Sequence, residues 1–319
     1  MRSEIFKKPL PYLALILAHI IWGGNYLVAK VTLQEFPPAS LAFLRFALAS
    51  LLLAPFLYAE TKKVKINPKD LPNLIMIGIF MVTLNIIFFF EGISRTTVIS
   101  GSSLTMIIPM LSVFVGWVFL KEKIYLINLL GIVLGLIGAL IIIGLPQLLL
   151  GNLISTTPTS YSFQTVLGNV LIILASVSFV IAAAISQKML KIYPSMVVTA
   201  IAFMVGTLTF FIPALREYLQ NPSWPFSISM LGVLGVIYMT LLSSISAYFL
   251  FEWGLAKTNM IYADVFQYIE PFIAVTLAIL ILSEELTIPV IIGAIFIAFG
   301  VFLGTFAKEA RHRHKLHRH

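Results

Sequence analysis

The sequence predicts an all-α integral membrane protein with ten transmembrane helices, arranged as two inverted five-helix repeats around a central cavity. Three observations predict this fold class. Of the 319 residues, 60% are hydrophobic and only 11% are charged, whereas a soluble protein has about 25% charged residues. Ten apolar runs of membrane-spanning length follow one another along the chain, and two stretches of sequence match at a fixed offset. A soluble two-domain protein is therefore not expected.

Each predicted span is an apolar run bounded by Pro, Gly or charged residues. A helix needs about 20 mostly apolar residues to cross a bilayer. The runs lie at 10–32, 38–58, 71–91, 97–119, 125–144, 166–187, 194–214, 229–250, 260–282 and 288–306. The first run leads into Asn25 and Lys30 without a small-residue cleavage pattern, so we interpret it as a retained helix rather than a signal peptide.

Lys and Arg residues are distributed unequally between the two sides of the predicted bundle. With a cytoplasmic N-terminus, 17 of the 21 Lys and Arg residues fall on the cytoplasmic side. Only Lys30, Arg95 and Arg216 fall on the other side, and Arg45 lies inside the second span. The positive-inside rule therefore predicts cytoplasmic N- and C-termini in the inner or plasma membrane. The net charge of +8 is then a consequence of topology, and no nucleic-acid partner is expected.

The two halves of the chain match without a gap at an offset of 162 residues. The matched pairs are Phe89 and Phe251, Gly92 and Gly254, Thr96 and Thr258, Pro109 and Pro271, Leu120 and Leu282, Glu122 and Glu284, Gly131 and Gly293, and Gly138 and Gly300. A weaker match near an offset of 157 pairs Leu17-Ala18 with Leu174-Ala175. Because each repeat holds an odd number of spans, the second repeat is inserted upside down relative to the first. Inverted repeats are typical of secondary transporters.

The repeat divides the chain into four segments. The first five-helix repeat occupies 1–144 and the second occupies 166–306, with an extracytoplasmic linker at 145–165 and a basic cytoplasmic tail at 307–319. We interpret the tail as a solvated segment; binding of anionic lipid or metal, or an engineered remnant, are the alternatives. Because both repeats lie in one chain, a monomer is sufficient.

Several short motifs lie at characteristic places in this framework. They are Trp22-Gly23-Gly24-Asn25 before Ala29-Lys30, Leu44-Arg45-Phe46, Pro109 with Leu120-Lys121-Glu122, and Glu270-Pro271 with Leu282-Ser283-Glu284. With ten spans and the repeat, they make the chain similar to the drug/metabolite transporter superfamily, specifically its ten-helix EamA-type branch. The resemblance implies a cavity lined mainly by spans one, three, four, six, eight and nine, with spans five and ten peripheral. It also implies export or exchange of small metabolites, often amino acids or related amphiphilic compounds.

Polar side chains at membrane depth form the predicted substrate site. An ionisable group at a span centre costs about 2.5–3.5 kcal/mol on insertion scales, so it needs a partner or a water-filled cavity. The predicted substrate-binding residues are Trp22, Asn25, Asn85, Thr105, Tyr248, Asp264, Gln267 and Tyr268. For Asn85 and Tyr248 the alternative is an interhelical hydrogen bond.

The ninth span carries three of these candidate positions, together with Pro271, on one predicted helix face. Asp264, Gln267, Tyr268 and Pro271 follow an i, i+3, i+4, i+7 spacing. Asp264 departs from the small residues that the resembling exporters have here, which leaves the charge of the substrate open. A water-exposed carboxylate at the cytoplasmic end is the alternative for Asp264.

Glu270 and His19 are the candidate residues for proton coupling. Glu270 lies near the middle of its span, and His19 is the only histidine outside the tail. The alternative for Glu270 is a structural hydrogen bond near the backbone freed by Pro271, and for His19 a packed side chain. We interpret Arg45 as structural, facing Glu35 or Glu91.

These features predict a secondary transporter that exports small metabolites, foremost amino acids or related amphiphilic compounds, by alternating access. The alternatives are an exporter of cationic drug-like or lipid-linked solutes with the same fold, and an integral-membrane enzyme. The expected partners are a small-molecule substrate, the lipid bilayer and, as a possibility, a coupling proton. The sequence has no phosphate-binding loop, metal-ligand motif or cysteine, so no cofactor, metal or catalytic residue is predicted.

Overall fold

The computed structural model describes residues 9–120, 126–144, 162–258, 263 and 266–303, and all their regular elements are helices. Asp264, the 307–319 tail and most of the 145–165 linker lie outside these residues. The helices are α2 (Pro9–Thr32), α3 (Pro38–Thr61), α4 (Leu71–Ile77), η1 (Gly78–Leu84), α5 (Asn85–Arg95), α6 (Val98–Leu104), η2 (Thr105–Ile107), α7 (Ile108–Leu120), α8 (Leu126–Ile143), α10 (Phe163–Met189), α11 (Ser195–Gln220), η4 (Trp224–Ser227), α12 (Met230–Ile237), η5 (Tyr238–Ser246), α13 (Ala247–Lys257), η6 (Phe266–Tyr268), α15 (Ile269–Leu282) and α16 (Ile288–Val301).

Within the described residues, eight continuous helical stretches are long and apolar enough to cross a membrane, and two shorter apolar stretches, Phe266–Leu282 and Ile288–Val301, follow them. Together they account for the ten predicted spans and confirm the all-α membrane fold. The eighth span runs from Met230 to Lys257, beyond the predicted end at residue 250. The prediction stopped before Glu252 because an acidic residue normally ends an apolar run, but this one is buried within the bundle.

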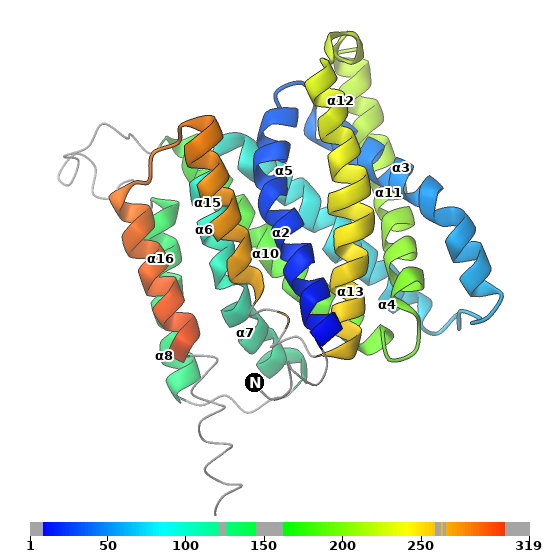
Figure 1. Ribbon diagram of the computed structural model, residues 1–319, viewed down its shortest axis with the longest axis horizontal. Coiled ribbons are helices and arrows are strands. Elements are labelled where there is room, and N and C mark those ends of the chain that lie inside the picture. Colours follow the sequence, from blue (N-terminus) through cyan, green and yellow to red (C-terminus); the bar gives the residue numbers. More distant parts are fainter. Residues whose placement is uncertain (1–8, 121–125, 145–161, 259–262, 264–265, 304–319) are drawn as a thin grey trace, which may run out of the picture.

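Each of the main helix pairs joins one half of the chain to the other. α3 packs against α11, α8 against α16, α5 against α10, and α2 against α13. In Figure 1 the α8–α16 pair lies at one edge of the molecule and the α3–α11 pair at the other, with α2, α5, α10 and α13 between them. The peripheral position of α8 and α16 agrees with the expectation for spans five and ten.

The contacts between α8 and α16 are reciprocal, as a pseudo-two-fold axis requires. A Cβ atom on Gly138 would lie 2.5 Å from the carbonyl oxygen of Gly293, and a Cβ on Gly300 would lie 2.6 Å from that of Gly131. Gly131 matches Gly293 and Gly138 matches Gly300 in the repeat. The glycines therefore let the two helix backbones touch at two equivalent points.

A second reciprocal contact lies between the central helices. A Cβ atom on Gly92 of α5 would lie 2.9 Å from the carbonyl oxygen of Gly168 on α10. A Cβ on the matching Gly254 of α13 would lie 3.1 Å from that of Pro11 on α2. Pro11 and Gly168 are related by the weaker offset of 157. The same interface is thus built twice, in opposite directions along the chain.

The helices depart from regular α-geometry at equivalent places in the two halves. The π-helical segments η1 and η5 interrupt the third and eighth spans, and the 3₁₀ segments η2 and η6 interrupt the fourth and ninth. Pro109 and Pro271 follow the 3₁₀ segments, and neither has an N–H to bond the carbonyl group four residues earlier. π-Helical segments occur frequently at functional sites.

The bundle has one strongly basic end, which we call the basic end. α2 begins and α13 ends there, and it carries Lys62, Lys63, Lys65, Lys69, Lys188, Lys191 and Lys257. A hydroxyl group links the two halves at this end, because Tyr193 donates to Oδ2 of Asp70 at 2.7 Å.

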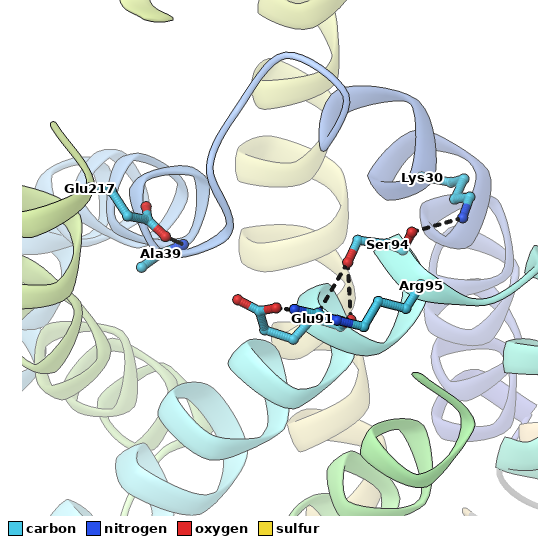
Figure 2. A network of polar contacts seen from close by, with 6 residues as sticks. All are labelled: Lys30, Ala39, Glu91, Ser94, Arg95 and Glu217. Carbon is cyan, nitrogen blue, oxygen red and sulfur yellow. Dashed lines mark hydrogen bonds and ion pairs between the residues drawn. The ribbon is translucent and has the colours of Figure 1, made fainter. Parts of the chain in front are cut away.

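At the opposite end, acidic side chains of the second half cap helices of the first half. A carboxylate oxygen of Glu217 accepts a hydrogen bond from the backbone N–H of Ala39 at 3.0 Å, at the start of α3 (Figure 2). Glu284 accepts from the backbone N–H groups of Val98 and Ile99 at 2.9 Å each, at the start of α6. Carboxylates are favourable here because helix N-termini carry a positive partial charge.

A lysine closes the end of α5 at the same level. Lys30 Nζ donates to the carbonyl oxygens of Ser94 at 3.3 Å and of Thr96 at 2.6 Å. Figure 2 shows the bond from Lys30 to Ser94 next to the ion pair between Arg95 and Glu91. These bonds lie within the first half of the chain and fix α2 against the end of α5.

Candidate substrate cavity

A cavity of about 80 Å³ lies between the two halves, at the level of the helix irregularities. It is lined by Trp22, Asn25, Tyr26, Arg45, Asn85, Ile86, Phe89, Thr105, Ile108, Ile172, Ala175, Ser176, Phe179, Ser243, Tyr248, Gln267 and Glu270. Six of the seven spans represented are those expected from the resemblance. The second span was not expected, and it contributes Arg45.

Aromatic side chains form one wall of the cavity. The ring of Trp22 lies 5.9 Å from Phe179, 5.2 Å from Tyr248 and 5.3 Å from Phe251, between ring centroids. Phe179 corresponds to Trp22 at the offset of 157, so both halves contribute a large aromatic ring at this point. This wall offers a broad apolar surface with few polar atoms.

The π-helical segments supply carbonyl acceptors to this wall. Trp22 Nε1 donates to the carbonyl oxygen of Ser243 at 3.0 Å, and the Tyr248 hydroxyl donates to that of Met81 at 3.3 Å. Met81 and Ser243 occupy equivalent positions in η1 and η5. In each half, a backbone carbonyl group of the π-helical segment therefore accepts a hydrogen bond from an aromatic side chain.

Arg45 is a buried cation beside the cavity, with a relative exposure of 1%. Its Nε donates to the hydroxyl of Ser244 at 2.5 Å and its Nη2 to that of Ser243 at 3.1 Å. Its guanidinium lies 5.0 Å from the centre of the Phe46 ring. Nη1 has no acceptor among the described residues.

The expectation that Arg45 faces Glu35 or Glu91 is wrong. Glu35 accepts hydrogen bonds from Ser229, and Glu91 is paired with Arg95. Glu35 therefore bonds to the start of α12, and Glu91 bonds to the last residue of its own helix, α5. An arginine inside an apolar span was the sequence signal that should have placed Arg45 in the cavity.

His19 and Glu270 form a buried pair that joins the first span to the ninth. His19 Nδ1 lies 2.7 Å from Oε1 of Glu270, and His19 is fully buried. Glu270 lines the cavity, whereas His19 lies behind it, with its Nε2 atom unpartnered in the described part of the chain. The two residues predicted separately as coupling candidates therefore form one unit.

The other predicted substrate-binding residues mostly reach the same cavity. Asn85 Nδ2 donates to the carbonyl of Ala175 at 2.9 Å, and Thr105 Oγ1 accepts from the Tyr26 hydroxyl at 3.1 Å. Asn25 and Gln267 also line the cavity, and Asn25 Oδ1 has no partner among the described residues.

Tyr268 does not line the cavity, although Gln267 and Glu270 do. The prediction placed Tyr268 on the same face by α-helical spacing. It lies in the 3₁₀ segment η6, where a turn holds three residues, so Gln267 and Glu270, three positions apart, share the cavity face and Tyr268 does not. Asp264 lies outside the described residues.

Metal binding finds no support in the described part of the chain, where no group of three or more His, Cys, Asp or Glu side chains is placed to hold an ion. What the cavity offers is an apolar aromatic wall, one guanidinium with a free N–H, one carboxyl paired with an imidazole, and amide oxygens. These groups suit binding of a small solute that has both apolar and charged parts.

Comparison with known proteins places the chain among transporters. A profile of the EamA-like transporter family matches residues 9–144 and 166–306. An uncharacterized transporter from Archaeoglobus fulgidus is 29% identical over 296 residues, which cover 92% of this chain and 96% of that protein. The uncharacterized transporter YoaV from Bacillus subtilis is 23% identical over 300 residues, which cover 94% of this chain and 98% of YoaV.

More distant similarity extends to plants and to solved structures. A WAT1-related protein from Arabidopsis thaliana is 22% identical over 330 residues, which cover 95% of this chain and 86% of that protein. A protein of known crystal structure with 17% identity superposes with a TM-score of 0.62, and the superposition covers 93% of this chain and 96% of that protein's chain. At that identity the likeness concerns the fold alone. The names of the relatives point to transport rather than to enzymatic activity.

Proposed function

Since the chain belongs to the EamA-like transporter family, it is a membrane transporter, and we propose that it is a secondary transporter of small amphiphilic metabolites. Amino acids and related compounds are the proposed substrate class, and export by alternating access is the proposed mechanism. The observation that carries the proposal is the cavity between the inverted halves, where a free guanidinium N–H, a carboxyl group and an aromatic wall converge.

Arg45 is the proposed anchor for the carboxylate of the substrate. Its Nη1 faces no acceptor among the described residues, and its other bonds go to neutral hydroxyls, so its charge is available to an anionic group. Guanidinium binds carboxylates in a bidentate geometry. A purely cationic solute would be repelled at this position, which favours amphiphilic metabolites over the cationic alternative.

The remaining groups of the cavity fit the other parts of such a solute. Glu270 and the side-chain oxygen of Asn25 can accept hydrogen bonds from an ammonium group, while Trp22 and Phe179 cover an apolar side chain. Because Glu270 is bonded to His19, binding of an ammonium group at Glu270 would change the protonation of this pair. The pair is therefore the proposed link between substrate binding and proton movement.

The size of the cavity supports a change of conformation during transport. Its 80 Å³ is well below the roughly 300–1,000 Å³ of typical small-molecule sites. A solute of amino-acid size therefore enters only when the two halves move apart. Because the halves share equivalent interfaces, exchanging their conformations would close one end of the bundle and open the other.

The proposed orientation follows from the charge distribution. The chain lies in the inner or plasma membrane, and its basic end faces the cytoplasm, as the positive-inside rule predicts. Both termini are then cytoplasmic. A single chain supplies every wall of the cavity, so a monomer suffices for transport.

The test is reconstitution of the purified chain in liposomes preloaded with an unlabelled amino acid, followed by uptake of radiolabelled phenylalanine and leucine. We expect counterflow of at least one of them. Trp22→Ala should lower this flux about tenfold or more through loss of the aromatic wall, a loss of about 1.4 kcal/mol or more of binding. Trp117→Ala is the matched control, because Trp117 is 45% exposed on the outer surface.

Two outcomes would contradict the proposal. Flux of tetraphenylphosphonium without flux of any amino acid would favour the cationic alternative. Flux that ignores a pH gradient would remove the coupling role of the pair formed by His19 and Glu270.

A further inference from the structure

Glu252 is a buried acid that the proposed substrate site does not use. It lies on α13, one turn beyond the cavity residue Tyr248 toward the basic end, and its relative exposure is 1%. The Ser186 hydroxyl of α10 donates to its Oε2 at 2.6 Å. Its Oε1 has no partner among the described residues.

No cation in the described part of the chain is paired with this carboxyl group. α13 packs against α2, η5, α11 and α10. The titratable groups on these elements and on α13 are Tyr12, His19, Tyr26, Lys30, Tyr238, Arg216, Glu217, Tyr218, Lys188, Tyr248 and Lys257. None of them is hydrogen-bonded or ion-paired to Glu252; His19 is bonded to Glu270, and Tyr248 donates to Met81. A carboxylate buried without a cation is strongly disfavoured, so burial favours the neutral acid in the described conformation.

The fold itself does not require an acid at this position. The matching residue of the first repeat is Phe90, which is fully buried on α5. The interfaces that α5 and α13 make are equivalent, so an apolar side chain would satisfy the packing in both. A buried acid that the packing does not need is expensive in a membrane and marks a functional position.

We propose that Glu252 is a proton-binding site that couples transport to the proton gradient, a proposal that rests on the proposed function. In the described conformation the acid is protonated and closed off from water. When the halves rearrange, the O–H bond of the carboxyl group breaks, the proton passes to water at the basic end, and the carboxylate stays. A proton from the opposite side restores the acid in the next cycle. The pair of His19 and Glu270 links solute binding to this cycle, while Glu252 carries the proton.

Its position along α13 suits this role. The helix runs from Tyr248 at the cavity through Glu252 to the exposed Lys257 at the basic end. The neighbouring Phe251 contacts the His19 ring, with centroids 6.1 Å apart. Glu252 is therefore at the same level as the buried pair but on the side of the helix that faces α10.

The first experiment uses protons alone as the probe. Infrared spectra of the reconstituted full chain are recorded at neutral and at alkaline pH, and the alkaline spectrum is subtracted from the neutral one. The difference should show the carbonyl band of a carboxyl group that is protonated at neutral pH. This band should be absent in Glu252→Gln, and its frequency should shift in Ser186→Ala because the hydrogen bond to Oε2 is lost. An unchanged band in Glu252→Gln, or no such band in the wild type, would overturn the proposal.

The second experiment separates coupling from transport. In liposomes, Glu252→Gln should keep the wild-type rate of phenylalanine counterflow but lose accumulation driven by a pH gradient. Glu252→Asp should recover part of the accumulation, and Glu60→Gln is the matched control because Glu60 pairs with Lys63 on the surface. Gradient-driven accumulation in Glu252→Gln equal to wild type would overturn the coupling role.

The two proposals fail separately. If the wild type shows no counterflow, the proposed substrate class fails, while the infrared band still decides whether Glu252 binds a proton. If counterflow occurs but accumulation ignores the gradient in the wild type, the coupling proposal fails and the substrate class stands.

Discussion

The two repeats carry equivalent glycines at their interfaces but different side chains at the cavity. Gly138 contacts Gly293 just as Gly300 contacts Gly131. Each repeat also has a π-helical segment in its third span. Yet Glu270 corresponds to Ile108 at the offset of 162. The cavity thus has a symmetric frame and an asymmetric lining.

This difference separates the residues that shape the bundle from those that carry its chemistry. A frame residue and its counterpart in the other repeat should respond alike to substitution. A lining residue should respond alone, because its counterpart has another side chain and other partners. Four sets of substitutions test this distinction, in order of decreasing effect.

The largest effect is expected at the buried pair. His19→Ala leaves Glu270 buried without its partner, which costs about 3–5 kcal/mol of stability. The counterpart Ser176→Ala should cost about 1 kcal/mol, because Ser176 Oγ only donates to Ile172 of its own helix. Thermal unfolding in detergent, followed by tryptophan fluorescence, measures both. Equal losses in the two variants would contradict the asymmetry of the lining.

Substitutions in the frame should be costly and equal. Gly138→Val and Gly300→Val each push a side chain into a facing backbone, with an overpacking cost of about 1–3 kcal/mol. Leu136→Ala is the control, because Leu136 is 48% exposed at the surface of α8. The same melting assay applies. A large loss in one glycine variant and none in the other would show that the reciprocal contact is not a true repeat feature.

Arg45→Lys should weaken substrate binding more than it weakens the fold. Lysine keeps the charge but loses the planar donors that reach Ser243 and Ser244 and the free N–H in the cavity. We expect the KM for counterflow to rise about tenfold, or about 1.4 kcal/mol. Arg216→Lys at the exposed end of α11 should leave the KM unchanged. A normal KM in Arg45→Lys would assign this residue to structure alone.

The smallest effect is expected from Glu35, at the end opposite the lysines. Hydrogen bonds from the Ser229 hydroxyl and backbone N–H hold the pKa of Glu35 below its ordinary value. A lowered folded-state pKa stabilises the protein above the unfolded pKa of about 4.3, and this contribution is lost as the pH falls through the folded value. Glu35→Gln should therefore melt slightly below wild type at neutral pH and match it in acid. A difference that persists unchanged in acid would contradict this linkage.

The frame could be predicted from sequence because its signals are local and repeated. Pro109 and Pro271 mark the irregular spans, and Gly131 and Gly138 recur as Gly293 and Gly300. These residues act through backbone geometry, which depends little on the rest of the molecule. The inverted topology follows from counting spans.

The lining could be predicted only in part. Asn25, Asn85 and Gln267 reach the cavity as expected from their depth in the membrane. Arg45 and Glu252 were missed for one physical reason: their bonding partners, Ser244 and Ser186, lie far away in sequence. When spans are predicted from apolar runs alone, a charged residue is interpreted as structural or as the end of a span. Tyr268 falls outside the cavity lining because η6 is a 3₁₀ turn, which α-helical spacing does not anticipate.

Alternating exposure of the cavity is the central claim, and single-cysteine accessibility tests it most directly. Because the sequence has no cysteine, Ser176→Cys introduces a single thiol in the cavity wall. Right-side-out and inverted vesicles are treated with a membrane-impermeant thiol reagent, with and without phenylalanine. We predict labelling from both sides, with phenylalanine changing the two rates. Labelling from one side only, at a rate that no solute changes, would contradict alternating access.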